Sequence, residues 1–183
     1  MNNWKKLTSK VVHTNPFFTV KEEEVIRPDK SRGIFYIIEQ NNSVMIVPLT
    51  KSCEIYLIHL YRYPTKMYSW EVPGGAMETN DVIGSAKKEL REETGLISHD
   101  WQILGNYQAM NGCINKTGFI LLAKNVVETD ENKQAEEGII RMKKVTFKTA
   151  VEMIRKGEVT DSHTVTALTL TGLSLGLLKS GNY

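Results

Sequence analysis

Three glutamates, Glu89, Glu92 and Glu93, are spaced so that one face of a helix would present them together. Residues three and four apart are neighbours on a helix, and like charges there repel by roughly a few tenths of a kcal/mol per pair. A well-solvated helix face tolerates such a cluster. A divalent cation would neutralise it, because Mg2+ prefers carboxylate oxygens and usually binds together with substrate phosphates. The spacing therefore indicates either a solvated face or a metal-assisted phosphate site.

The segment before these glutamates favours the metal site. Residues 73–76 read Pro-Gly-Gly-Ala, and glycine lets the backbone approach a ligand closely because it carries no Cβ. Asn80 or Asp81 would form the N-cap of the helix, and Gly95 would end it. A strand, a glycine loop and an acidic helix together would direct carbonyls, carboxylates and a helix N-terminus at one ion–phosphate complex.

Residues 75–96 resemble the Nudix box, whose pattern is Gly, five residues, Glu, seven residues, then Arg-Glu-aliphatic-x-Glu-Glu-x-Gly-aliphatic. Residues 88–96 match the second half except at Lys88, which stands where the pattern has arginine. The first half is one residue short, so its glutamate position falls on Asn80 or Asp81. The resemblance implies an enzyme that hydrolyses a nucleoside diphosphate linked to another moiety.

The rest of the chain predicts a mixed α/β (α+β) fold. A length of 183 residues with 41% hydrophobic residues suits a domain with a substantial core. Strands are predicted over residues 19–27, 33–39, 43–49, 54–61, 103–109, 117–123 and 139–146, and helices over 148–156 and 161–179. The resemblance implies a Nudix fold, with a mixed sheet sandwiched between helices. We expect residues 1–40 to form an N-terminal antiparallel strand extension involved in dimer packing, and residues 41–183 to form the Nudix hydrolase domain.

Within the family, the chain is most similar to the ADP-ribose pyrophosphatases. Residues 59–64 (His-Leu-Tyr-Arg-Tyr-Pro) resemble that group's Gln-Tyr-Arg-x-Pro, and residues 71–75 (Glu-Val-Pro-Gly-Gly) resemble its Glu-Leu-Pro-Ala-Gly. Residues 157–168 resemble its closing Gly-x-Ile-x-Asp-x-x-Thr-x-x-Ala-Leu. Many members carry a proline about sixteen residues after the box, which residues 110–113 (Met-Asn-Gly-Cys) lack. The reaction type is therefore better indicated than the substrate.

The favoured substrate is ADP-ribose, hydrolysed to AMP and ribose 5-phosphate. Another nucleotide sugar such as GDP-mannose is the main alternative, because the box does not encode base or sugar. A Nudix module that senses a nucleotide without hydrolysing it is the second class of function. Loss of a box glutamate would favour the sensor, and here all three remain.

The resemblance implies the metal ligands. Glu89 and Glu93 would be the principal ligands of Mg2+, with Mn2+ as an alternative ion. Glu92 would share a second ion and so take part in catalysis, and the Gly74 carbonyl would complete the coordination shell. Lys88 would hold a carboxylate in place from behind, although lysine lacks the bidentate fork of arginine.

The resemblance implies a general base in the loop before the last predicted strand, where Glu136 and Glu137 lie. A polar loop can also contain acids without any function, and Glu137 is weakly favoured of the two. Arg62 is the candidate for phosphate binding, since a guanidinium can clamp two phosphate oxygens. The alternative is that Arg62 is a surface or helix-pairing arginine. The Gly75 backbone is expected close to the substrate.

Adenine would need an aromatic face for stacking, and Phe17 and Phe35 are the candidates in the N-terminal strands. An aromatic residue in a strand is nevertheless more often part of the core. In the resembling group these strands complete the neighbouring subunit's site, so the resemblance implies a homodimer.

Charge and composition exclude several classes of protein. A net charge of +2 and a pI near 8.4 are too mild for a nucleic-acid partner. Residues 167–178 are the most apolar run but too short to span a bilayer, and the N-terminus shows no secretory signal. Cys53 and Cys113 fit neither a disulfide framework nor a zinc site. We therefore expect a cytoplasmic enzyme that acts on a small-molecule nucleoside diphosphate derivative, with no membrane partner.

Overall fold

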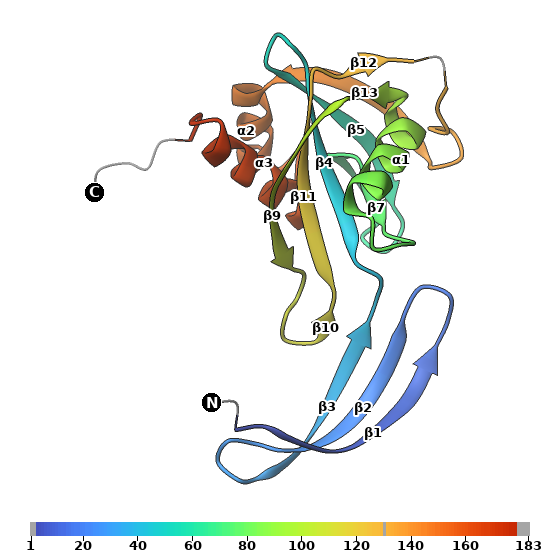
Figure 1. Cartoon of the computed structure of the whole chain (residues 1–183), viewed down its shortest axis with the longest axis vertical. Coiled ribbons are helices and arrows are strands. Elements are labelled where there is room, and N and C mark those ends of the chain that lie inside the picture. The colour runs from blue at the N-terminus through green and yellow to red at the C-terminus, as the bar shows by residue number, and fades with distance from the viewer. Residues whose placement is uncertain (1–2, 130, 179–183) are drawn as a thin grey trace, which may run out of the picture. The chain divides into compact units, whose positions relative to one another are not determined.

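The computed structural model describes residues 3–129 and 131–178 (Figure 1). Its strands are β1 (Lys5–Thr14), β2 (Thr19–Ile26), β3 (Arg32–Glu39), β4 (Ser43–Leu49), β5 (Glu54–Arg62), β6 (Met67–Glu71), β7 (Gly74–Ala76), β8 (Leu96–Ile97), β9 (Asp100–Gln108), β10 (Ile114–Asn115), β11 (Thr117–Lys124), β12 (Val127–Glu128) and β13 (Ile139–Thr146). Its helices are α1 (Val82–Thr94), α2 (Phe147–Arg155) and α3 (Ser162–Ser174). They fall into two units. The N-terminal unit comprises residues up to Asn42 together with Tyr107–Thr117, and the main unit comprises the remainder.

The main unit is built on a mixed sheet of seven strands. The strand order is β13-β5-β4-β11-β9, with β6 paired to β5 and β7 paired to β4. Strands β4 and β11 run parallel, whereas β5 pairs antiparallel with both β4 and β13. Every residue of β4 is buried, as expected for a central strand that is covered on both faces.

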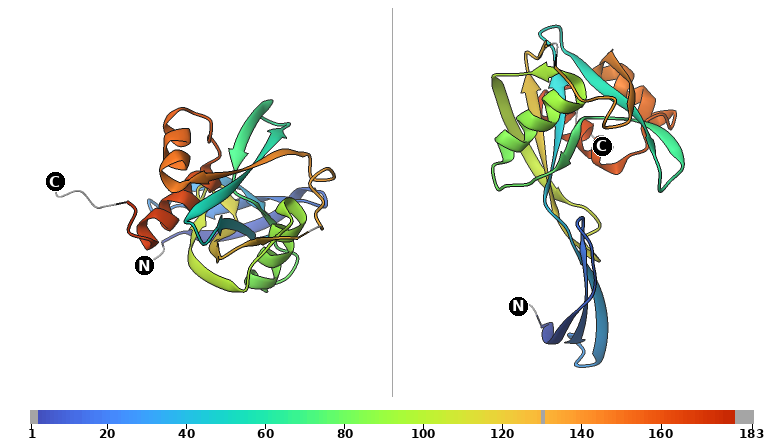
Figure 2. Two further views of the ribbon diagram at one scale, coloured as in Figure 1. Left: turned by 90° about the horizontal axis from the view of Figure 1, so that it is seen from above. Right: turned by 90° about the vertical axis from the view of Figure 1, so that its right-hand side faces the viewer.

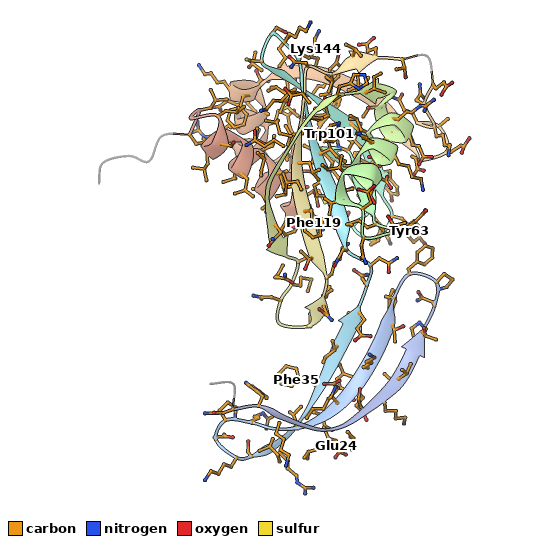
Figure 3. The ribbon with its side chains drawn as sticks, in the orientation of Figure 1. Glu24, Phe35, Tyr63, Trp101, Phe119 and Lys144 are labelled. Atoms are coloured by element: carbon orange, nitrogen blue, oxygen red, sulfur yellow. The ribbon has the colours of Figure 1, made fainter. Side chains whose placement is uncertain are left out.

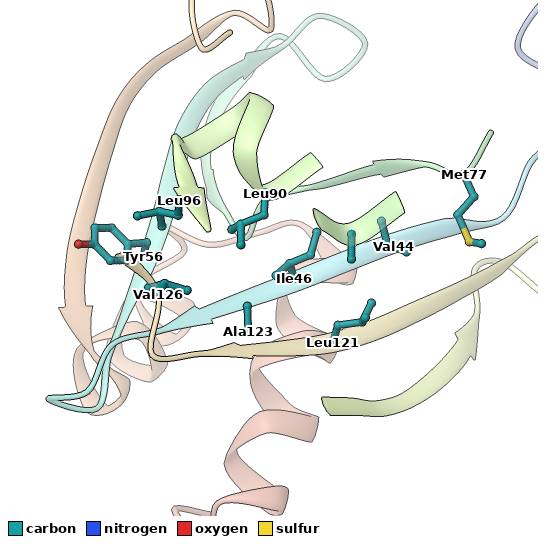
Figure 4. Packing of buried hydrophobic residues seen from close by; sticks show 10 residues of the cluster. Val44, Ile46, Tyr56, Met77, Leu90, Leu96, Leu121, Ala123 and Val126 are labelled. Atoms are coloured by element: carbon teal, nitrogen blue, oxygen red, sulfur yellow. The ribbon is translucent and has the colours of Figure 1, made fainter. Parts of the chain in front are cut away.

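Helices cover both faces of this sheet. Helix α1 lies on one face, and α2 and α3 lie on the other (Figures 1 and 2). The core between β4, β11 and α1 is apolar and closely packed (Figure 4). It includes Ile46 from β4, Leu121 from β11 and Leu90 from α1, each with no exposed surface. Burial of Leu90 fixes which side of α1 faces the sheet, and therefore where its polar residues lie.

Both ends of α1 are capped by local chemistry. The Asp81 side chain accepts a hydrogen bond from the Gly84 N–H at 2.9 Å, which makes Asp81 the N-cap. Gly95 ends the helix with φ of 69°, in the left-handed region that favours glycine, and its N–H donates to the Arg91 carbonyl. The sequence left the N-cap open between Asn80 and Asp81, and the structure selects Asp81.

The N-terminal unit is a four-stranded sheet in the order β1-β2-β3-β10. Strands β1, β2 and β3 are antiparallel neighbours, and β10 runs parallel to β3. Many of its apolar side chains are exposed, among them Ile34 and Tyr36 on β3. Phe35 points from the same strand and meets Trp4 edge to face, with 5.2 Å between ring centroids (Figure 3).

The predicted fold class, a mixed sheet between helices with an N-terminal antiparallel extension, is confirmed. The strands predicted over 43–49 and 139–146 have those same bounds in the structure. Strand β1 was not predicted, because lysines, serine and threonine interrupt its apolar residues and both of its faces are exposed. The last helix ends at Ser174, earlier than the predicted residue 179, which lies outside the described residues. Of the helices that the structure describes, none has the length and apolar character needed to cross a bilayer.

Candidate active site

The glycine loop places its backbone directly against Glu93. Strand β7 pairs antiparallel with β4, with Gly74 opposite Met45. A Cβ at Gly74 would lie 2.2 Å from the Val44 carbonyl oxygen, so only glycine permits this approach. The Gly74 N–H donates to Glu93 Oε2 at 2.7 Å. The strand pairing therefore positions the loop, and the loop positions one carboxylate of α1.

The carboxylate of Glu89 lies over the next residue of the loop. A Cβ at Gly75 would lie 2.6 Å from Glu89 Cδ and within 2.8 Å of both carboxylate oxygens. Glu89 and Glu93 are four residues apart on α1, so they share the helix face that meets the loop. The structure thus brings together four of the residues predicted for the metal site and the substrate: Gly74, Gly75, Glu89 and Glu93.

Both carboxyl groups bind protons more tightly than glutamates in water. The pKa of Glu93 is raised to about 8, mainly by burial and also by the negative charges of Glu89 and Glu137, whereas the Gly74 N–H and Arg62 lower it. Burial is also the main cause that raises the pKa of Glu89, followed by the charge of Glu92. Two neighbouring carboxyl groups with raised pKa values indicate a site where a bound cation would stabilise their ionised forms.

Glu89 and Glu93, with the loop residues Gly74 and Gly75, form what we call the acidic site. Arg62 lies at its edge, at the end of β5. Its Nη2 donates to Glu71 Oε2 at 2.7 Å, and its Nε donates to Glu71 Oε1 at 3.1 Å. The Glu71 side chain is only 3% exposed, whereas the Arg62 side chain is 48% exposed. The charge of Arg62 also acts on Glu93 and Asp161. Sequence reasoning missed Glu71 as a site residue, although its position opposite Ile58 in the β5–β6 pairing follows from the hairpin.

The structure distinguishes the two loop glutamates. Glu137 raises the pKa of both Glu89 and Glu93 through its charge. Glu136 instead acts on Lys133. Their N–H groups both donate to the Lys133 carbonyl, at 2.9 Å for Glu136 and 3.1 Å for Glu137. Of the two candidates, Glu137 is therefore the one whose charge acts on both buried carboxyls.

Glu92 and Lys88 each form an ion pair with a residue outside the pair Glu89 and Glu93. Lys133 Nζ donates to Glu92 Oε1 at 2.5 Å. Lys88 Nζ donates to Glu78 Oε1 at 2.8 Å, where the sequence predicted a contact with a carboxylate of the box. Glu78 was missed, because only the turn before α1 brings it back to Lys88 across ten residues of sequence.

The aromatic candidates lie in the N-terminal unit. The sequence predicted Phe17 in a strand, but it lies in the turn between β1 and β2, and 81% of it is exposed. The Asn15 side chain forms that turn by accepting the N–H groups of Phe17 and Phe18, at 2.8 and 3.0 Å. Phe35 packs on Trp4. Neither ring belongs to the unit that carries the acidic site.

The acidic site offers what a hard divalent cation needs. Its donors are oxygens, its two central carboxyls are buried enough to raise their pKa, and the close approach at Gly75 leaves Glu89 directly over the loop backbone. Within residues 3–129 and 131–178, no three acidic, histidine or cysteine side chains already have the arrangement of a metal site.

Two cavities adjoin α1. One of about 120 Å3 opens beside Glu89, between the turn at Glu78 and the first turn of the helix at Gly84 and Ser85. Another of about 690 Å3 is lined by residues that include Arg91, Trp101 and Lys133, but neither Glu89 nor Glu93 lines it. The larger cavity is also lined by Glu92, so it reaches the box at this glutamate but not at the two buried carboxyls.

Comparison with known proteins identifies the fold and the family. Residues 39–167 match the model of the NUDIX domain, and residues 4–38 match a model described as the nucleoside diphosphate sugar hydrolase N-terminal domain. A crystal structure of an ADP compounds hydrolase superposes with a TM-score of 0.81 at 20% identity, covering 95% of each chain. At that identity the likeness shows the fold alone.

Two curated relatives align over most of the chain. An ADP-ribose pyrophosphatase of Mycobacterium tuberculosis is 25% identical over 167 residues, covering 88% of this chain and 79% of its own. A CMP-5'-(N-acetyl-N-hydroxy-3-aminopropyl)phosphonate hydrolase of Streptomyces rubellomurinus is 27% identical over 177 residues, covering 94% and 84%. With the NUDIX model matching well over half of its length, this chain belongs to the Nudix hydrolase family.

Proposed function

We propose that this Nudix hydrolase cleaves the pyrophosphate bond of ADP-ribose, giving AMP and ribose 5-phosphate, with Mg2+ as its metal and Mn2+ as a substitute. The observation that carries the proposal is the pair of buried carboxyls, Glu89 and Glu93, held against the glycine loop beside Arg62. The name of the Mycobacterium tuberculosis relative supports an ADP-linked substrate.

The chain's own groups divide the work of hydrolysis. Glu89, Glu93 and the Gly74 carbonyl would hold a divalent ion, with Glu92 sharing a second one. When bound, the metal supplies neutralisation of the phosphate charge and acidification of a water molecule. Glu137 is the residue that accepts a proton from the attacking water, because it is the loop glutamate whose charge reaches both buried carboxyls. Arg62, fixed on one side by Glu71, holds a phosphate oxygen with its exposed edge.

A substrate panel tests the proposal. We would incubate the protein with Mg2+ and ADP-ribose, GDP-mannose, ADP-glucose or a diadenosine polyphosphate, and identify products by ion-exchange chromatography. ADP-ribose should give AMP and ribose 5-phosphate, and Glu93→Gln should lower kcat/KM on the order of 10^3-fold, the several kcal/mol that a metal site supplies. Glu54→Gln, a substitution of a partly exposed glutamate in the same unit, is the matched control. Tight binding of one compound without its hydrolysis would instead favour a sensor.

A different nucleotide substrate is the second candidate. The family model that matches the N-terminal residues is named for nucleoside diphosphate sugar hydrolases. The Streptomyces rubellomurinus relative is named for a CMP-linked phosphonate. Preference for GDP-mannose in the panel would support a nucleotide-sugar hydrolase with the same metal site and a different base pocket.

We further propose that the N-terminal unit packs against a second copy of the chain. Ile34 and Tyr36 on β3 are each 55% exposed and, being two residues apart, share one face of the strand. An apolar sheet face of this kind usually marks an interface. Ile34→Glu combined with Tyr36→Glu should shift the mass measured by light scattering from dimer to monomer. Lys51→Glu, in the turn after β4, should leave it unchanged. The cytoplasmic location remains a prediction from sequence.

A further inference from the structure

The segment on either side of residue 130 is fastened along the C-terminal half of α1. The Thr129 N–H donates to the Gly95 carbonyl, and the Lys133 N–H donates to the Glu92 carbonyl, each at 2.7 Å. Two ion pairs add to these bonds: Lys133 with Glu92, and Arg91 with Glu131. Side chains and backbone thus fix this segment to the same helix that carries the buried carboxyls.

Lys133 contacts both a box glutamate and the turn that carries Glu137. Its side chain binds Glu92, one of the three box glutamates, with 2.5 Å between Nζ and Oε1. Its carbonyl accepts the N–H groups of Glu136 and Glu137, which start the turn that leads into β13. Lys133 therefore contacts both Glu92 and the turn that carries Glu137.

A carboxylate oxygen that accepts the Lys133 ammonium cannot fully coordinate a cation at the same time. The Glu92 side chain is 21% exposed, so a divalent ion and the ammonium group can both reach it. Mg2+ binds carboxylates through direct or water-mediated contacts and would displace a singly charged partner. By linkage, whatever weakens the Lys133–Glu92 pair then favours the metal, and the metal weakens the pair to the same extent.

We propose that Lys133 is a positioning residue that competes with the divalent ion for Glu92, so that metal binding releases the turn carrying Glu137. The inference rests on the proposed function, because it takes Glu92 as a metal-binding residue. In the metal-free protein the ammonium group takes the place of the cation and holds the turn. In the metal-bound protein the turn is free to adjust over the substrate.

Calorimetric titration with Mg2+ and with Mn2+, in the absence of substrate, tests the competition. Lys133→Met should bind metal about two- to fivefold more tightly than the unmodified protein, the range that an exposed ion pair contributes. Arg91→Met is the matched control, since it removes the other ion pair of the same segment without touching a box glutamate. Its metal affinity should be unchanged. Lys133→Arg should retain the competition.

A double-mutant cycle assigns the effect to Glu92. In a Glu92→Gln background, Lys133→Met should no longer change metal affinity, because the contested carboxylate is gone. Hydrogen exchange of the peptide covering residues 131–139 gives a second readout. Mg2+ should speed its exchange in the unmodified protein, whereas in Lys133→Met exchange should be fast with or without the ion.

The outcomes separate this inference from the proposed function. If the unmodified protein hydrolyses ADP-ribose with Mg2+ but Lys133→Met binds metal with unchanged affinity, the competition is wrong and the function stands. An affinity change that persists in the Glu92→Gln background would also overturn it. If the unmodified protein binds neither metal, both the inference and the metal-dependent function fail.

Discussion

Glu71 holds Arg62 by a two-point ion pair in which the acid is buried and the base is half exposed. Arg62 Nη2 and Nε both donate to the carboxylate, at distances of 2.7 to 3.3 Å. In the β5–β6 hairpin Glu71 lies opposite Ile58 and Arg62 lies opposite Met67, so the two side chains share one face of the hairpin and meet along it. A guanidinium fixed on one edge loses less conformational freedom when its other edge binds a phosphate. The pair therefore indicates that Arg62 is prepared for an anion before the anion arrives.

Glu71→Gln should weaken phosphate binding through Arg62. Glutamine keeps the shape of the side chain but removes the charge, and hydrogen bonds to charged groups contribute about 1.5–3 kcal/mol. We expect KM for ADP-ribose to rise about tenfold or more while kcat changes less. The same substitution in an Arg62→Ala background should have little further effect. A rise of similar size there would contradict a role through Arg62.

Gly75→Ala should reduce activity without unfolding the protein. The added Cβ would lie 2.6 Å from the Glu89 carboxyl, so this flexible side chain has to move away from the loop. We expect at least a tenfold loss of Mg2+ affinity by calorimetry and a melting temperature within a few degrees of the unmodified protein. Gly112→Ala is the control, because a Cβ there meets nothing within 4 Å. Equal metal affinity in both variants would show that Glu89 is not a ligand.

Glu137→Gln and Glu136→Gln should differ although the residues are adjacent. Loss of a general base typically lowers the rate by about 10^2- to 10^4-fold. We expect such a decrease in kcat for Glu137→Gln and less than about a twofold change for Glu136→Gln. Steady-state kinetics at saturating Mg2+ measures both. If Glu136→Gln showed the larger loss, the assignment of the base would have to be exchanged.

The metal-free protein should become less stable as the pH rises from about 4.5 to about 8. The folded state raises the pKa of Glu93 from 4.5 to about 8, so between these values it binds a proton that the unfolded chain releases. Stability falls with pH wherever the folded state holds more protons, by about 1.4 kcal/mol per unit of pKa difference at most. Urea unfolding should show a decrease of a few kcal/mol that Glu93→Gln removes. Mg2+ should reverse the decrease above pH 7, because it replaces the proton.

Much of the fold could be predicted because it depends on local periodicity and capping. The β-branched residues of Ile139–Thr146 predicted β13 with its observed bounds. Gly95 ended α1 as expected, since a left-handed C-cap favours glycine in any context. Strand β1 lacked such a signal, because Lys5–Thr14 has no buried face to impose an apolar alternation. Sequence pattern reports burial within the chain, so an exposed strand is hard to find.

The sequence by itself determined the chemistry of the candidate site. The spacing of Glu89 and Glu93 on one helix and the two glycines before it already indicate a metal and phosphate site, because helix geometry depends on spacing alone. Tertiary structure alone decided the partners. Pairing of β7 with β4 put the Gly74 N–H on Glu93, and the long connection before β13 brought Glu137, rather than Glu136, toward the buried carboxyls. Such contacts depend on strand register and loop path, which no short stretch of sequence encodes.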